Sequence, residues 1–331
     1  MKKLQRILLV ALLLAPAMKS NAQDVVFTQF YANPLYMNPA FAGSKVCPRL
    51  SLSFRSQWPA LVSAYTTASV SWDQYFSSLH GGLGAYVMTD RQGDHGALST
   101  TAAAFMYSFR FQLGRDVWVN AALQAGVTNA HLDCDNLRFP DQIDPVNGFT
   151  GQTSAQMPEA LSKWYIDFAA GVLVYGDAWY AGVAADHLTQ PSNGFYGITR
   201  VPLKLTGNVG ALINLSEDRR RTSSLGLGTP VISPNFIYQY QAGFHYFNYG
   251  LYLDWMPFLV GVWFRQGVQN ADAFIFQIGF QQDYFKIGYS YDVTVSKLAN
   301  NTAGAHEISL GVMLPCPQAK HKIKAIRCPS F

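Results

Sequence analysis

Alternation of apolar residues with small or polar residues, at a period of two, most constrains what this chain can fold into. In the stretch 117–127 the odd positions are apolar, with Asn120, Gln124 and Gly126 on the other face. The stretches 274–281 and 287–294 repeat the pattern. Successive side chains of a strand point to opposite faces, so each stretch predicts a strand with one apolar and one small, polar face. Strands of about ten residues with this pattern are typical of outer-membrane barrels.

No stretch after residue 22 approaches the roughly 18 apolar residues that a membrane-spanning helix needs. The longest apolar runs, 168–175 and 258–264, have the length of a strand. A membrane location therefore requires a closed barrel, because only helices and barrels satisfy their backbone groups in lipid. Charged residues make up only 13% of the chain and aromatic residues 14%, which suits an outer face in contact with lipid. The alternative is a soluble sandwich or propeller, whose strands are usually shorter.

The pattern predicts an all-β, transmembrane outer-membrane β-barrel of about fourteen antiparallel strands. Bacterial barrels have an even number of strands, and because the joint between the ninth and tenth is poorly marked, twelve or sixteen stay open. The expected strands are 49–57, 63–74, 81–90, 98–111, 116–130, 163–175, 178–187, 203–215, 233–241, 243–255, 258–266, 272–281, 284–294 and 305–314.

The connections between these strands predict an orientation. With the start of the chain in the periplasm, the long connections 131–162, 188–202 and 295–304 fall outside the cell, and the short turns fall inside, as in known barrels. The connection 216–232, which carries Arg219, Arg220 and Arg221, is long and yet falls inside. Either the strand count slips there, or this basic loop binds a partner.

Residues 1–22 have the features of a cleaved signal peptide, with basic residues at the start, an apolar core and a Ser-Asn-Ala cleavage site. We therefore expect four parts: a signal peptide (1–22), an N-terminal arm or plug (23–48), the β-barrel (49–314) and a basic periplasmic tail (315–331). Without the signal peptide the chain has 20 basic and 20 acidic residues, because Lys2, Lys3, Arg6 and Lys19 are lost. This balance gives no reason to expect nucleic acid as a partner.

The arm contains two Asn-Pro steps, Asn33-Pro34 and Asn38-Pro39, among aromatic residues. Each Pro fixes its own φ angle and disfavours helix at the preceding Asn, so the arm should be extended and rich in turns. It would enter the lumen or brace its periplasmic mouth; the alternative is an ordered arm without a function of its own.

Several charged residues lie within the expected strands, on the small, polar face. A Lys or Arg facing lipid at the midplane would cost roughly 2–4 kcal/mol, so these residues should line the lumen and pair across it. They would form either an internal ion-pair network or the lining for a passing solute. The set is Arg110, Lys204, Asp254, Arg265, Asp292 and Glu307.

Four cysteines, Cys47, Cys134, Cys316 and Cys328, match no zinc pattern, and an exported chain meets an oxidising compartment. We expect a Cys316–Cys328 disulfide, contributing about 3 kcal/mol by loop entropy; a Cys47–Cys134 pair is an alternative. The tail also carries cations and no acid, either as a solvated charge run or as a docking element for a periplasmic protein. These cations are Lys320, Lys322, Lys324 and Arg327.

No residue pattern indicates catalysis, a cofactor or a metal site. Asp94-His95 and Asp186-His187 come without a nucleophile motif such as G-x-S-x-G. The acidic residues of the longest loop, at 133, 135, 141 and 144, lack the spacing of a calcium loop. We expect a protein that is not an enzyme and has no cofactor.

Three motifs carry a resemblance to a known family. The first, Q-F-Y-x-N-P-L-Y-x-N-P-A-x-A-G, comprises Gln29, Phe30, Asn33, Pro34, Asn38, Pro39, Ala40 and Gly43. The second is G-V-W-F-R at 261–265, followed by D-A at 272–273. The third is G-Y-S-Y-D at 288–292, followed by G-A-H-E at 304–307. Together they resemble the PorP/SprF family, outer-membrane proteins of the type IX secretion system of Bacteroidota.

The resemblance implies a non-enzymatic outer-membrane component of the type IX secretion and gliding machinery. Its implied partners are periplasmic ring or motor subunits, a peptidoglycan-binding protein, and secreted cargo with a C-terminal secretion domain or a gliding adhesin. It implies no catalytic residue. The alternative function is an outer-membrane pore or hydrophobic-solute transporter, with the arm as a hatch.

Overall fold

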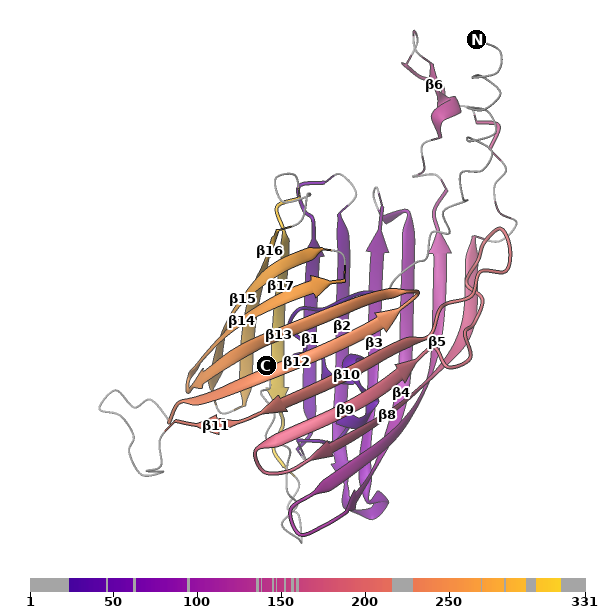
Figure 1. The fold of residues 1–331 in the computed structure, drawn as a ribbon. Coiled ribbons are helices and arrows are strands. Elements are labelled where there is room, and N and C mark those ends of the chain that lie inside the picture. Colours follow the sequence, from indigo (N-terminus) through magenta and orange to yellow (C-terminus); the bar gives the residue numbers. More distant parts are fainter. Residues whose placement is uncertain are drawn as a thin grey trace, which may run out of the picture.

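Fourteen antiparallel strands form a closed barrel in the computed structural model of the chain (Figure 1). The predicted fold class and strand count are therefore confirmed. The wall consists of β1 (Arg49–Gln57), β2 (Tyr65–Phe76), β3 (Gly81–Gln92), β4 (Leu98–Gln112), β5 (Trp118–Leu132), β8 (Ser162–Tyr175), β9 (Trp179–Asp186), β10 (Lys204–Ala211), β12 (Val231–Gln241), β13 (Phe244–Trp255), β14 (Phe258–Gly267), β15 (Ala271–Gln282), β16 (Phe285–Thr294) and β17 (Ala305–Met313).

The structure describes residues 24–316 except for 46, 62–63, 94–95, 135–136, 138, 145, 147, 152, 156–157, 159–160, 216–228, 269, 283 and 296–301. Within these described ranges, no helix has both the length and the apolar character needed to cross a membrane. The helical elements are single turns: α2 (Pro34–Met37), η1 (Pro39–Phe41), η2 (Ser77–Leu79) and η4 (Pro140–Gln142).

The barrel closes through two long-range strand pairs. β1 pairs with β17, from Arg49 opposite Met313 to Gln57 opposite Ala305. β10 pairs with β12 across the long connection between them, starting with Lys204 opposite Gln241. Closure satisfies the backbone groups that an open sheet edge would expose to lipid.

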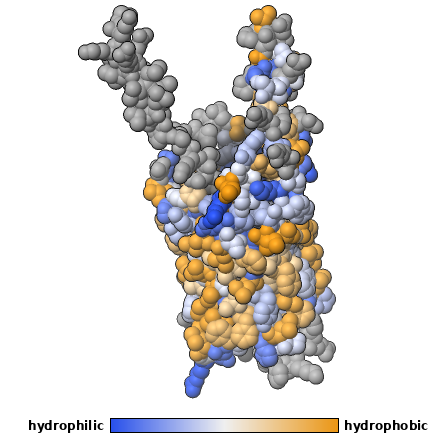
Figure 2. All heavy atoms as spheres, turned by 90° about the vertical axis from the view of Figure 1, so that its right-hand side faces the viewer, coloured by the Kyte–Doolittle hydropathy of each residue, from blue (hydrophilic) through white to orange (hydrophobic). Residues whose placement is uncertain are grey.

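The two faces of the wall invert the usual arrangement of a soluble protein. Large apolar side chains such as Phe105, Leu123 and Trp164 are exposed on the outside, and Figure 2 shows a broad hydrophobic band across the face of the barrel in view. Serine, threonine, asparagine and charged side chains are buried on the inside. This inversion is the arrangement that lipid requires on the outside of a barrel whose interior is polar.

The two ends of the barrel differ in their connections. At the end where β1 begins, here called the turn end, five connections are short: 77–80, 113–117, 176–178, 256–257 and 283–284. The opposite end, the loop end, carries the long connections 133–161, 187–203 and 295–304. The connection from β10 to β12 lies at the turn end and is still long, so the strand count does not slip there. Arg219, Arg220 and Arg221 within it lie outside the described residues.

Three local features differ from the sequence-based prediction. The poorly marked ninth joint is a two-residue turn at Ala242 and Gly243, both with positive φ, as a tight hairpin requires. The expected strand 203–215 is interrupted at Leu212, and its end forms the separate β11 (Ile213–Asn214). The longest loop contains a small hairpin of β6 (Ile143–Asp144) and β7 (Gly148–Phe149) at its far end (Figure 1).

The predicted Cys316–Cys328 disulfide is wrong, because Cys316 bonds to Cys47. The register of β1 and β17 explains the pairing: Arg49 lies opposite Met313, so the chain before β1 and the chain after β17 meet at the turn end. The alternative Cys47–Cys134 pair is excluded too, since Cys134 is a free thiol. Cys328 lies outside the described residues.

Because the disulfide closes a loop of 269 residues, Cys316→Ser should lower the stability of the barrel. The chain-entropy estimate for so long a loop is about 5 kcal/mol, as an upper value. The measurement is the temperature at which the folded band disappears in heat-modifiability electrophoresis. Cys134→Ser is the matched control and should change nothing; equal melting of both variants and the parent would contradict the assignment.

Candidate functional site: the arm inside the barrel

The N-terminal arm (residues 24–48) runs through the lumen from one mouth to the other. Its first described residue, Asp24, hydrogen-bonds through its backbone N–H to Gln241, at the loop end of β12. Near its exit, the Gly43 N–H donates to Asp73 of β2, at the turn end. Phe27 to Ala42 are almost entirely buried. The described part of the chain therefore starts at the loop end and reaches β1 only after crossing the lumen, whereas the prediction placed the start of the chain at the end with the short turns.

The two Asn-Pro steps shape the middle of the arm, which is not extended as predicted. Pro34 opens the helical turn α2 and Pro39 opens the turn η1, each directly after an Asn. Proline restrains the residue before it but is favourable at the first position of a helix, where its missing N–H is not needed. The Asn38 side chain accepts a hydrogen bond from Ala40 N–H (2.9 Å) and so begins η1.

The same asparagines attach these turns to the wall. Asn33 donates to Ser69 Oγ of β2 (3.1 Å), and Asn38 donates to the carbonyls of Val172 and Val183 (3.3 Å each). The wall leaves space for this contact, since a Cβ on Gly171 would lie 2.1 Å from the Asn38 side chain. The Asn38 side chain of the arm therefore packs directly against the backbone of the wall.

Gly43 allows the arm to leave the lumen. Its φ of +68° is in the left-handed region, and an added Cβ would lie 2.5 Å from Gly82 Cα of β3. Any larger residue would be strained and would also clash with backbone, so glycine is required at this position.

A buried carboxylate fixes the first half of the arm. Glu307 of β17 accepts hydrogen bonds from two successive backbone N–H groups, of Thr28 (2.8 Å) and Gln29 (3.1 Å). The Gln29 side chain in turn donates to the Glu307 carbonyl (2.8 Å). Charge-assisted hydrogen bonds are roughly twice as strong as neutral ones, so Glu307 is the main polar anchor of this segment.

Glu307 belongs to a chain of buried ion pairs. Arg55 of β1 lies between Glu307 (3.4 Å) and Asp292 (3.0 Å), and Asp292 also contacts Arg265 (3.4 Å). Arg265 is further paired with Asp272. Two arginines therefore bridge three carboxylates beside the arm, which neutralises charges that could not stay buried alone.

The six residues predicted to pair across the lumen occupy three different places. Arg265, Asp292 and Glu307 belong to the ion-pair chain just described. Lys204 contacts Asp24 of the arm at the loop end (3.5 Å). Arg110 donates to the Gly43 carbonyl (2.9 Å) and lies over the Tyr75 ring near the turn end, where Asp254 is half-buried.

Arg55 and Asp24 are missing from the predicted set, and only Arg55 had a signal in the sequence. Arg55 alternates with Ser51 and Ser53 on the small, polar face of 49–57, the rule that selected the other charges. Asp24 lies in the arm, where no strand pattern assigns a face.

Aromatic contacts complete the site below the ion pairs. The Phe30 ring lies 5.0 Å from the ring of Trp263 on β14, and Tyr31 lies in edge-to-face contact with Tyr180 and Tyr252. Tyr31 Oη also donates to Asn235 of β12 (3.2 Å). Trp263 is fully buried by this packing.

The three family-like motifs therefore meet at one place. The first supplies Gln29 and Phe30 of the arm, the second supplies Trp263 and Arg265, and the third supplies Asp292 and Glu307. The first motif lies more than 200 residues before the other two in the sequence, and the fold brings all three together around the first half of the arm.

At the loop end, His187 holds the arm between two carboxylates. Its Nε2 lies 2.8 Å from Asp24 and its Nδ1 lies 2.8 Å from Asp167 of β8, and Lys204 also approaches Asp24. Burial disfavours the imidazolium, but attraction by Asp24 and Asp167 outweighs it and raises the pKa of His187 to about 10. The ring therefore stays cationic at neutral pH. We call Asp24, His187, Asp167 and Lys204 the latch.

The remaining sequence candidates lie in several places. His187 of the Asp186-His187 pair belongs to the latch, whereas Asp94-His95 lies outside the described residues. Asp141 accepts hydrogen bonds from Thr153 and Ser154 and organises the loop around η4. Over the described residues, no group of three His, Cys, Asp or Glu side chains is arranged to hold a metal ion. Lys320, Lys322, Lys324 and Arg327 lie outside the described residues.

Glu307→Gln should loosen the arm and lower the stability of the barrel by about 3–5 kcal/mol, because Arg55 would lose a partner in a buried site. The measurements are heat-modifiability and the rate at which a protease cuts within residues 24–48. Asp141→Asn is the control, because this carboxylate accepts hydrogen bonds from Thr153 and Ser154 within the long loop. Equal cleavage rates in the two variants would contradict the anchoring role of Glu307.

Known proteins agree with this architecture. The Ralstonia pickettii toluene transporter TbuX has a similar fold, with a TM-score of 0.51 at 10% identity over 86% of this chain and 92% of that chain. The Acinetobacter baumannii outer membrane protein Omp33 is also similar, with a TM-score of 0.45 at 7% identity over 82% of this chain and 100% of that chain. At such identities the similarity concerns the fold alone.

No curated protein matches the sequence. Residues 19–312, however, match the family described as "Type IX secretion system membrane protein PorP/SprF". This region contains the arm, the wall and all three motifs around Glu307. The chain is thus an outer-membrane β-barrel that belongs to the PorP/SprF family of type IX secretion system membrane proteins.

Proposed function

We propose that this barrel acts in the type IX secretion machinery as a plugged, non-catalytic docking platform, whose turn end binds a periplasmic partner. The observation that supports the proposal most is the arm, which occupies the lumen from mouth to mouth and is bonded through Cys47 to the segment after β17. A barrel filled in this way offers its ends, rather than its interior, to other molecules.

Burial of the arm argues against a function that needs the arm to leave. Tyr31, Leu35, Ala40 and Phe41 are each at most 1% exposed. Each large apolar side chain that is fully buried contributes roughly 1.5–3 kcal/mol, and the ion pairs and hydrogen bonds at Glu307 add to this. Withdrawal of the whole arm would therefore be costly, and the disulfide retains its end at the turn end.

The turn end collects the elements that would meet a partner. The arm exits there beside the Cys47–Cys316 disulfide, the chain continues there into the basic tail, and the long connection 215–230 lies at the same end. Short turns mark the periplasmic end of bacterial barrels. The cations at 219–221 and 320–327 would attract an acidic surface of a ring or motor subunit, a peptidoglycan-binding protein, or secreted cargo.

A pore or hydrophobic-solute transporter is the second candidate. Its support is the fold, which resembles that of the toluene transporter TbuX, together with a segment placed inside the lumen as a hatch would be. Conductance in planar bilayers separates the two functions. The docking proposal expects no steady current from the full chain, and steady current with the arm intact would favour a pore.

Replacing Lys320, Lys322, Lys324 and Arg327 by Gln should release periplasmic partners, because it removes the charges that attract an acidic surface. The measurement is mass spectrometry of proteins that co-purify from detergent extracts. A matched control replaces Arg91 and Arg200, at the loop end, by Gln, and should keep every partner. Retention of all partners by the tail variant, with the barrel still heat-modifiable, would contradict docking through the tail.

A further inference from the structure

Five polar atoms on one part of the lumen wall are buried without a hydrogen-bond partner. They are Thr206 Oγ1 and both side-chain atoms of Asn208 on β10, and both side-chain atoms of Asn248 on β13. Each of the three residues is at most 3% exposed. Unpaired buried polar groups cost about 1–3 kcal/mol each and are rare in native proteins, so their clustering needs a physical reason.

Strand register brings these residues together. Thr206 lies opposite Gln239 of β12, and Gln239 lies opposite Tyr246 of β13. In the next inward-facing row, Asn208 and Asn248 lie on either side of Ile237. With strands about 4.8 Å apart, the two asparagines are about 10 Å apart. We call Thr206, Asn208, Gln239 and Asn248 the polar patch.

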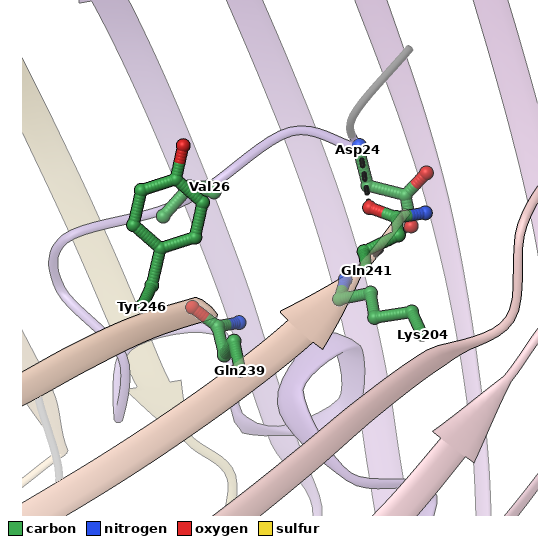
Figure 3. A pocket seen from close by; sticks show the side chains of 6 residues that line it. All are labelled: Asp24, Val26, Lys204, Gln239, Gln241 and Tyr246. Carbon is green, nitrogen blue, oxygen red and sulfur yellow. Dashed lines mark hydrogen bonds and ion pairs between the residues drawn. The ribbon is translucent and has the colours of Figure 1, made fainter. Parts of the chain in front are cut away.

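A pocket at the loop end borders this patch at Gln239. It is lined by Asp24, Val26, Lys204, Gln239, Gln241 and Tyr246. In Figure 3, Val26 of the arm lies near Tyr246, while Asp24 lies above Lys204 and Gln241. The buried Gln239 Oε1 is unpartnered as well. At this level the arm contributes Val26, whose apolar side chain cannot hydrogen-bond to the wall.

We propose that the polar patch is a binding site for small, uncharged, hydrogen-bonding molecules that enter from the loop end, with Asp24 as its gate. The site is independent of the docking proposed at the turn end, which uses the opposite mouth.

The side chains define the ligand class. Two asparagine amides and a threonine hydroxyl offer both donors and acceptors, so a ligand with hydroxyl or amide groups can satisfy them. The neighbouring cations are already paired, Lys204 with Asp24 (3.5 Å) and Arg265, which lies opposite Asn248, with Asp292 (3.4 Å), which leaves no free charge to select an ion. An apolar ligand would leave the amides unpaired and is excluded by that cost.

Asp24 closes the pocket because it bridges three elements. It contacts Gln241 of β12 through its N–H (2.9 Å), Lys204 of β10 (3.5 Å) and His187 after β9 (2.8 Å). Loss of its carboxylate would free the first residues of the arm while the anchor at Glu307 still holds Thr28 and Gln29.

The test measures cysteine reactivity in the full-length barrel, in a Cys134→Ser background that keeps the Cys47–Cys316 disulfide. Thr206→Cys and Asn208→Cys probe the patch at two positions. Met106→Cys, a fully buried site on β4 close to the arm's Leu35 and Ala42, is the matched apolar control. The probes are 2-hydroxyethyl methanethiosulfonate, which is polar and uncharged, and benzyl methanethiosulfonate, which is apolar.

The polar probe should modify Thr206→Cys and Asn208→Cys at least ten times faster than Met106→Cys, and faster than the benzyl probe does. Adding Asp24→Ala should increase the patch rates further and leave the Met106→Cys rate unchanged. The proposal would be overturned if Thr206→Cys and Asn208→Cys reacted no faster than Met106→Cys, both with Asp24 and with Asp24→Ala. Faster reaction of these two variants with the benzyl probe than with the polar probe would overturn it as well. Heat-modifiability verifies that each variant is folded, and if one patch variant does not assemble, the other decides.

Discussion

This structure depends above all on the two hydrogen bonds that Glu307 accepts from the backbone N–H groups of Thr28 and Gln29. Lipid on the outside favours an inward position for the charged and hydrogen-bonding side chains of the wall, where side chains and backbone must replace water as partners. The arm supplies them: Thr28 and Gln29 bind Glu307, and the ion pairs of Arg55 with Glu307 and Asp292 complete the neutralisation. The wall and the arm therefore stabilise each other, and neither has a satisfied interior alone.

The mutual stabilisation of arm and wall supports the proposed docking function better than a function as an open pore. The chain starts at the loop end, crosses the lumen, leaves it beside Gly43, and is bonded at Cys47 to the segment that follows the last strand. Both termini of the wall and the arm exit are thereby gathered at the turn end. The latch holds the other end of the arm. The two proposals assign different roles to the two mouths, a docking platform at the turn end and a gated polar pocket at the loop end.

The sequence predicted the wall well because lipid imposes a strict period of two on each strand, which gave fourteen strands and their approximate ends. It placed Arg265, Asp292 and Glu307 on the inner face by the same rule, and Arg55 could have been found in this way. The Cys47–Cys316 pair followed from the register of β1 with β17, which a strand list alone does not contain. The direction of the arm and its helical turns were not predictable, because they depend on contacts with strands up to about 280 residues away, such as that of Gln29 with Glu307.

The central claim is that the arm lies in the lumen against the wall at Glu307, and one cross-linking measurement tests it most directly. Thr28 Oγ1 and Ser290 Oγ are 3.2 Å apart, so cysteines at these two positions are close enough to join. In native membranes of a Thr28→Cys, Ser290→Cys variant in which Cys47, Cys134, Cys316 and Cys328 are all replaced by Ser, so that no native disulfide holds the arm, we expect a disulfide to form without added oxidant. After protease cleavage between the arm and β16, that bond would keep the arm attached to the barrel. An arm that separates under non-reducing conditions, while the barrel stays folded, would contradict the account.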